Sequence, residues 1–154
     1  MANIKFIAHR GNYNGIQTAW ENTSDYLEFA FYDKKHDVEC DLILHKGILY
    51  YGHDEPVDTA NLGFIQQQGV WCHAKTLETL EELLKMRTNC FWHEQDTVTL
   101  TSEKYIWCFP GNFPRNKRAV WLDLEGIPLP EDITGIYGIC GDHVREDIDF
   151  WTTR

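Results

Sequence analysis

Residues 38–44 of this chain are Val-Glu-Cys-Asp-Leu-Ile-Leu, an apolar run interrupted by two acids. Side chains alternate between the two faces of a strand, so Glu39 and Asp41 share one face, opposite Val38, Cys40 and Leu42. Acids are depleted in strands, and the mutual repulsion of two carboxylates is relieved when both hold a cation. The run therefore predicts a strand with a cation-binding face, whose oxygen ligands favour Mg²⁺ or Ca²⁺.

Two histidines lie at strand ends on either side of this run. His9 follows the apolar residues 4–8 and precedes Arg10, and His53 closes the β-rich run Ile48–Tyr51. Histidine is suited to proton transfer near neutral pH, and a guanidinium group can hold a phosphate through several hydrogen bonds. Together with the acid pair, these residues form a set suited to metal-assisted phosphodiester chemistry.

The rest of the chain shows short β-rich runs and two helical segments, without repeats, low-complexity segments or linkers, which predicts one domain over residues 1–154. One helix is expected to begin in the cap region Asn22–Ser24, and the other to span Thr76–Met86. The predicted strands cover residues 4–8, 38–44, 48–52, 70–74, 90–94, 97–100, 104–108, 119–124 and 136–141.

The alternation of strands and helices in the first half of the chain is typical of a (β/α) barrel. The chain is shorter than the roughly 200 residues at which such barrels begin, and residues 89–142 are rich in strands and poor in helical pattern. We therefore predict the α/β class, as a reduced or incomplete TIM-type (β/α) barrel with few helices in the second half. Hairpins and short loops are expected to replace the missing helices.

The run Phe6-Ile7-Ala8-His9-Arg10-Gly11, followed by Glu21-Asn22-Thr23, Glu39-x-Asp41 and His53-Asp54, resembles the glycerophosphodiester phosphodiesterase family. That family belongs to the phosphatidylinositol phospholipase C-like barrel superfamily. The match is dense through Pro56 and continues with His73-Ala74-Lys75 and a terminal motif at residues 138–142.

The resemblance implies a hydrolase of lipid metabolism that uses one divalent cation to cleave glycerophosphodiesters. It implies that His9 and His53 are the catalytic acid and base and that Glu39 and Asp41 hold the metal. Arg10, Lys75 and Glu21 are then substrate-binding residues; a first-turn acid that serves the helix dipole is the alternative for Glu21. In relatives, attack by the substrate's own hydroxyl gives a cyclic phosphate, which water then opens.

His73 departs from the family pattern, which has glutamate as a third metal ligand at this position. Three alternatives follow: His73 shifts the metal preference towards Mn²⁺ or Zn²⁺, replaces the carboxylate through a water molecule, or marks a site without metal. Glu94 on the next predicted strand is a candidate replacement ligand, and a polar strand end is its alternative interpretation.

Two other functions remain open at this stage. One is a phosphodiesterase or lyase with an altered substrate that releases the cyclic phosphate as its product. The other is a catalytically degenerate binding module for phosphorylated metabolites, which His73 and the short chain would favour. Product analysis separates the first from a hydrolase, and the presence of both histidines, Arg10 and the acid pair argues against the second.

Composition excludes several partners. With 24 acidic and 14 basic residues the net charge is −10, whereas nucleic acids and anionic membranes require a basic surface. No apolar run approaches the roughly 18 residues of a membrane span, and the first motif begins too early to leave room for a signal peptide. We expect a small phosphodiester substrate, no nucleic acid and no membrane span.

The five cysteines are scattered and never spaced as Cys-x-x-Cys. This pattern is typical of reduced, buried thiols rather than of a disulfide framework or a zinc site, and it predicts a cytoplasmic protein. The oligomeric state stays open; a homo-oligomer that closes the cleft left by missing barrel loops is one alternative.

Overall fold

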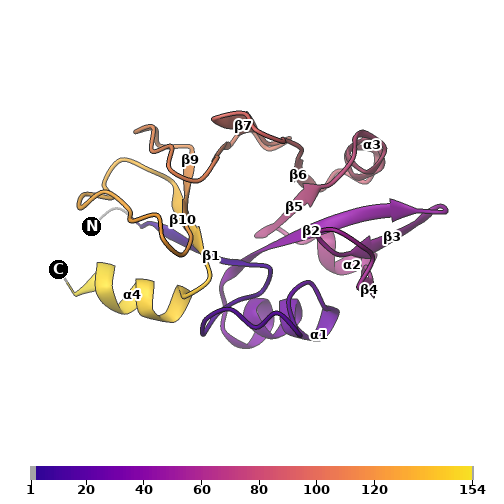
Figure 1. Ribbon diagram of the computed structural model, residues 1–154, viewed down its shortest axis with the longest axis horizontal. Coiled ribbons are helices and arrows are strands. Elements are labelled where there is room, and N and C mark those ends of the chain that lie inside the picture. The colour runs from indigo at the N-terminus through magenta and orange to yellow at the C-terminus, as the bar shows by residue number, and fades with distance from the viewer. Residues whose placement is uncertain (1–2, 154) are drawn as a thin grey trace.

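The computed structural model describes residues 3–153, in which ten strands form one mixed sheet that curls into a half-barrel (Figure 1). The strands are β1 Lys5–His9, β2 Asp37–His45, β3 Ile48–Tyr51, β4 Asp58–Thr59, β5 Val70–Ala74, β6 Asn89–Phe91, β7 Val98–Leu100, β8 Ile106–Cys108, β9 Ala119–Asp123 and β10 Gly138–Gly141. The helices are α1 Ser24–Glu28, which continues into the π-helical turn η1 Phe29–Asp33, then α2 Leu62–Ile65, α3 Leu77–Lys85 and α4 Val144–Thr152.

Parallel pairing joins seven strands in the order β6, β5, β2, β1, β10, β9 and β8. Antiparallel strands complete the sheet. β7 pairs with β8 at one edge, β3 pairs with the second half of β2, and β4 pairs with β3. Lys46 and Gly47 form the tight turn between β2 and β3, both with positive φ, as the favoured two-residue hairpin turns require.

The predicted TIM-type barrel is wrong, also in its reduced form. Such a barrel alternates strands and helices around a closed parallel sheet, whereas this sheet is open and mixed, and the described residues hold only four short α-helices. From β8 to β10 the chain crosses over in coil rather than in helices. Proline residues that oppose helix formation occupy these crossovers, at positions 110, 114, 128 and 130.

The individual elements agree better with the sequence pattern than their assembly does. Each of the nine predicted runs overlaps an observed strand, and the two predicted helices appear as α1 and α3. Thr76 caps α3 by accepting a hydrogen bond from the backbone N–H of Thr79, and α3 packs on β2, β5 and β6. The elements β4, α2 and α4 were not predicted; β4 and α2 have only two and four residues.

The alternation of side chains separates two environments on either side of the sheet. Val38, Cys40 and Leu42 pack with the residues of α1 and α2 in one apolar cluster. On the opposite face, inside the curl, a second cluster gathers side chains from strands on both sides of β1: Ile7, Trp71, Phe91, Trp107, Val120 and Leu122. Glu39 and Asp41 share this inner face and are almost fully buried, so the fold encloses the two acids that the sequence places together.

Asp147 of α4 and Asp123 at the end of β9 form a second carboxyl pair. This pair leads us to expect a stability that depends on pH. Burial and the neighbouring Asp123 raise the pKa of Asp147 to about 7. A carboxyl with a raised pKa in the folded state destabilises the protein as pH rises from the usual carboxyl range towards that value. Asp147→Asn should therefore stabilise the protein at pH 8 by about 1 kcal/mol, a value reduced for solvent screening of this half-buried group.

Urea denaturation at pH 4 and pH 8 measures this effect. The gain should be present at pH 8 and absent at pH 4, and the exposed Asp149 of the same helix supplies the control Asp149→Asn. An equal effect of Asp147→Asn at both pH values would contradict the assignment.

Candidate active site

The register of the parallel strands brings the predicted site residues to one end of the sheet. His9 of β1 is aligned with Glu39 of β2, and Asp41 of β2 is aligned with His73 of β5. Asp142 follows β10 directly, next to the end of β1. Because the carboxyl ends of parallel strands lie at the same edge of a sheet, side chains from distant parts of the chain converge there.

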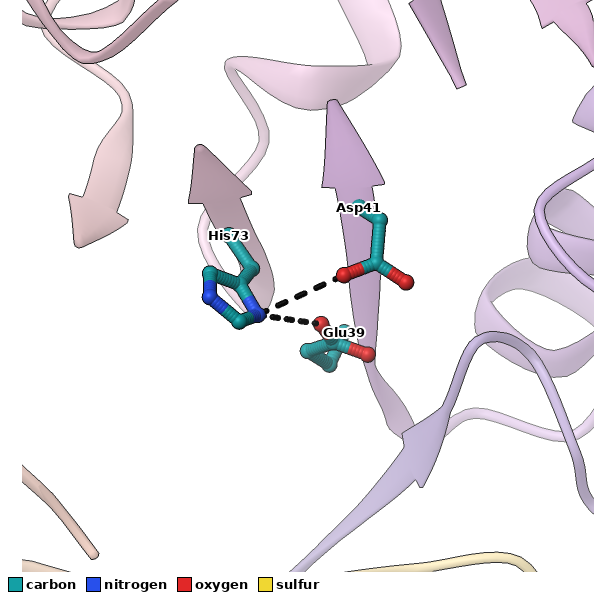
Figure 2. A group of neighbouring side chains, drawn as sticks. All are labelled: Glu39, Asp41 and His73. Carbon is teal, nitrogen blue, oxygen red and sulfur yellow. Dashed lines mark ion pairs between the residues drawn. The ribbon is translucent and has the colours of Figure 1, made fainter. Parts of the chain in front are cut away.

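Glu39, Asp41 and His73 form a group able to hold a metal ion, with one ligand atom of each within 4.8 Å of the others. Figure 2 shows the imidazole of His73 on β5 turned towards both carboxylates on β2. His73 Nδ1 lies 3.3 Å from Asp41 Oδ1 and 3.7 Å from Glu39 Oε1. Position 73 therefore directs a nitrogen at the acid pair.

The ring of His73 is fixed by stacking on Phe91 and His93, at centroid distances of 4.7 and 5.2 Å. Its Nε2 is buried and has no hydrogen-bond partner. Burial lowers the pKa of His73, but pairing with Asp41 and Glu39 outweighs burial and holds it above the usual value. In contrast, burial and the neighbouring His73 and Lys75 lower the pKa of His93 to about 4.

His9 forms the second functional unit, with Asp142. The Nδ1 atom of His9 lies 2.8 Å from Asp142 Oδ1. Because an ionised carboxylate only accepts hydrogen bonds, Nδ1 carries the proton, and in neutral His9 the lone pair is on Nε2. This Nε2 is 3.9 Å from Glu39 Oε2. His9 is thus oriented to accept a proton beside the acid pair.

Two cationic side chains, Arg10 and Lys75, also contact Asp41. Arg10 Nε is 3.0 Å from Asp41 Oδ2 and Lys75 Nζ is 3.4 Å from Asp41 Oδ1. Arg10 also contacts Glu21, at 3.4 Å. Burial raises the pKa of Asp41, but His73, Lys75 and Arg10 outweigh burial and hold it well below the usual carboxyl range. Asp41 is therefore ionised at every physiological pH.

The backbone after β1 turns Arg10 back towards the acids. Arg10 and Gly11 both have positive φ, 53° and 86°, and a side chain at Gly11 would come within 2.9 Å of the Tyr26 ring. Glycine accepts this conformation without strain. The Arg10 N–H then donates a hydrogen bond to Glu39 Oε2, at 3.2 Å.

Three supporting residues were not predicted as part of the site. Asn22 donates to Asp41 Oδ2 at 3.0 Å and accepts from the backbone N–H of Asp41 at 2.9 Å. Asn12 is fully buried and donates to both Glu21 and Asp142, at 2.8 Å each. Asp142 itself was interpreted only as part of a terminal motif. Asn22 has a positive φ of 55°, a backbone conformation that asparagine tolerates better than most residues.

The other predicted residues occupy the edges of the site. His53 lines the same cavity as His9 and pairs with the exposed Asp54, whose Oδ1 is 2.8 Å from His53 Nδ1. Glu21 reaches the site through Arg10 and Asn12. Glu94 lines the cavity as an exposed side chain, outside the group formed by Glu39, Asp41 and His73.

The cavity that these residues share has a volume of 390 Å³. Its charged side is formed by His9, Arg10, Glu39, Asp41, His73 and Lys75. The remaining walls come mainly from side chains on and after β6, β8 and β9. The site thus combines proton-transfer groups, anion-binding cations and metal-binding acids in one small volume.

The Asp142–His9 hydrogen bond predicts the position of the acidic limb of a pH–rate profile. Burial lowers the pKa of His9, but Asp142 and the charge of Glu39 outweigh burial and raise it above the usual value. Asp142→Asn removes one of these negative charges, so the pKa of His9 should fall. If neutral His9 accepts the proton, the acidic limb of kcat/KM should move to lower pH.

Steady-state kinetics from pH 5 to 9 measure this shift, with Asp132→Asn at an exposed, remote position as the control. An acidic limb that stays in place, or moves to higher pH, would contradict the role given to Asp142.

No family model, no curated protein and no solved structure matches this chain. Among the described residues, no helix is long and apolar enough to cross a membrane. The prediction of buried, free cysteines is confirmed for all five. The function is therefore inferred from the cavity and the residues in it.

Proposed function

We propose that this protein is a metal-dependent phosphoric diester hydrolase that acts on glycerophosphodiesters, in keeping with the resemblance of residues 6–56 to that enzyme family. The observation that carries the proposal is the convergence of His9, the acid pair and two cations in one cavity. A module that only binds phosphate has no need of an oriented histidine–carboxylate pair beside metal-binding acids. The free cysteines favour the cytoplasm as its compartment.

The donor set fits a divalent cation. Glu39 and Asp41 supply two buried carboxylates, and His73 supplies a nitrogen that faces both. We propose that these three residues hold the metal. When bound, the cation supplies positive charge for a phosphate oxygen and lowers the pKa of a coordinated hydroxyl group.

Other residues of the cavity carry out proton transfer and bind the phosphate. His9, with its lone pair on Nε2, accepts the proton of the attacking hydroxyl, and Asp142 stabilises the imidazolium that forms. His53, held by Asp54 through Nδ1, donates a proton to the departing alcohol, and attack by the substrate's own hydroxyl leaves a cyclic phosphate. Neutral His53 then accepts a proton from the water that opens the cyclic phosphate, and His9 returns its proton to the released hydroxyl. Arg10 and Lys75 stabilise the charge on the phosphate oxygens, and Glu21 orients Arg10.

Phosphorus NMR of a glycerophosphodiester incubated with the protein and a divalent cation tests this proposal. The diester signal should disappear, and the signal of glycerol phosphate should replace it. Accumulation of a cyclic phosphate alone would favour the alternative enzyme that stops at the cyclic product. An unchanged diester signal in folded protein would contradict both.

Metal choice is a separate prediction that follows from His73. An imidazole ligand suits Zn²⁺ and Mn²⁺ better than Mg²⁺ and Ca²⁺. The wild type should therefore bind Zn²⁺ and Mn²⁺ about tenfold more tightly than Mg²⁺ and Ca²⁺. In His73→Glu a third carboxylate replaces the imidazole, and the affinity for Mg²⁺ or Ca²⁺ should rise relative to that for Zn²⁺. The tenfold margin is an order-of-magnitude expectation, about 1.4 kcal/mol of binding free energy.

Isothermal titration calorimetry of the metal-stripped proteins measures these affinities without any turnover. His45→Glu is the matched control, because His45 ends β2 but is exposed and outside the cavity. If wild type and His73→Glu have the same order of metal affinities, His73 is not a metal ligand.

A further inference from the structure

The cavity has two chemically different halves. The charged half comes from the ends of β1, β2 and β5. The opposite half comes from β8, β9 and the segments that follow β6, β8 and β9. Most of its side chains are apolar, with His93 and Glu94 beside them: Trp92, Trp107, Phe109, Pro110, Leu122 and Leu124. A pocket for a small, fully polar molecule does not require such a wall.

The apolar half is built from packed side chains. Trp107 and Leu122 belong to the inner cluster and are only 2% and 6% exposed. Trp107 stacks on Phe91 at 4.5 Å, and the ring of Phe109 contacts His93 edge-on at 6.0 Å. These contacts hold the wall in place from behind, and the half-buried Phe109 is its more accessible part in the cavity.

His73 lies at the boundary between the two halves. Its Nδ1 faces the carboxylates of Glu39 and Asp41, while one face of its ring stacks on Phe91, which in turn stacks on Trp107. A phosphate group at the charged half therefore leaves one of its substituents close to the apolar half. A hydroxylated substituent placed there would lose water without gaining hydrogen-bond partners, which is unfavourable.

We propose, on the basis of the proposed function, that one of the two alcohols in the phosphodiester substrate is apolar, an alkyl or aryl group seated against Trp107, Phe109 and Leu122. The apolar wall selects this substituent, and the charged half binds the phosphate. The substrate class is thus a glycerophosphodiester with an apolar alcohol, rather than one with two polar alcohols.

Calorimetric titration with monoalkyl phosphates tests the wall independently of turnover. The Kd should fall from methyl to butyl to hexyl phosphate, by about three- to fourfold for each methylene that is buried. A Kd that does not change with chain length, or the absence of binding, would overturn the proposal.

A second pair of probes separates apolar recognition from recognition of a cation, because aromatic rings beside Glu94 are also compatible with a quaternary ammonium group. Phosphocholine and 3,3-dimethylbutyl phosphate have nearly the same shape, but only the first carries the positive charge. The 3,3-dimethylbutyl ester, whose substituent is uncharged, should bind at least as tightly as phosphocholine. Tighter binding of phosphocholine would overturn the assignment of an apolar alcohol.

Variants locate the effect in the cavity. Phe109→Ala should reduce the ratio of hexyl to methyl phosphate affinity by about tenfold, whereas Phe109→Leu should keep most of that ratio. Phe113→Ala is the matched control, because Phe113 lies in the same loop but packs on Trp121 and does not line the cavity. An unchanged ratio in Phe109→Ala, or an equal loss in Phe113→Ala, would place the alkyl chain elsewhere and overturn the proposal.

Failure of this inference is distinguishable from failure of the proposed function. Cleavage of glycerophosphoglycerol with no preference for the hexyl ester of glycerol phosphate would keep the phosphodiesterase and remove the apolar selectivity. Binding of alkyl phosphates with the expected chain-length dependence, but without cleavage of any diester, would keep the apolar subsite and remove the catalytic function.

Discussion

Replacing His9 by asparagine should lower kcat/KM for a glycerophosphodiester by a factor of about 10² to 10⁴, the usual contribution of a general acid or base. Asparagine can still donate a hydrogen bond to Asp142, but it has no ring nitrogen to accept the proton that Nε2 is placed to receive. The loss should appear mainly in kcat, since the phosphate-binding cations Arg10 and Lys75 are untouched.

His45→Asn is the matched control for this variant. His45 is an exposed histidine at the end of β2, outside the cavity, and its replacement should leave kcat within a factor of about two of the wild type. Comparable losses in both variants, or full activity of His9→Asn, would exclude His9 as the proton acceptor.

Asp41→Asn should lower the free energy of unfolding by about 3 kcal/mol or more at pH 7. The carboxylate is 1% exposed and lies between Arg10, Lys75 and His73. A neutral amide removes the negative charge that these three groups share at Asp41, and its N–H₂ group cannot accept a hydrogen bond from any of them. Urea denaturation in the presence of a chelator measures the loss without a contribution from bound metal.

The pH dependence of this loss follows from the lowered pKa of Asp41. A depressed carboxyl pKa stabilises the fold above the usual carboxyl range, and this stabilisation is lost as pH falls towards the depressed value. The difference between wild type and Asp41→Asn should therefore shrink below about pH 4. Asp54→Asn, at a carboxylate 92% exposed, should change stability little at either pH; an equal effect of both variants would contradict the proposed network.

The local pattern of the sequence predicted the elements and the acid pair well. Alternation in residues 38–44 placed Glu39 and Asp41 on one face, and the structure shows that face inside the curled sheet. Strand propensity located β2 and β3 to within one residue at each end. These features depend on neighbours in the chain, which the sequence displays directly.

Long-range features were not predictable in the same way. Asp142 meets His9 across 133 residues of chain, and that contact follows from the register of β1 and β10. Closure of the sheet depends on how residues 89–141 cross over, and the coil crossovers and the β7–β8 hairpin leave it open. The prediction expected few helices in the second half, but it was wrong in assuming that the strands would still form a TIM-type barrel.

His73 shows how a departure from a motif gains meaning from structure. In the sequence it is a substitution with three alternatives, whereas in the fold its Nδ1 faces Glu39 and Asp41 and its ring stacks on both Phe91 and His93. This orientation favours the alternative in which His73 is a direct ligand and alters metal choice.

The most direct test of the phosphodiesterase assignment is turnover by metal-stripped protein on a panel of glycerophosphodiesters, with Mg²⁺, Ca²⁺, Mn²⁺ and Zn²⁺ added back singly. We expect activity to return with Mn²⁺ or Zn²⁺ and to be lost in His9→Asn under the same conditions. Absence of turnover with every metal, in wild-type protein shown to be folded by its cooperative unfolding, would contradict the assignment of a catalytic site.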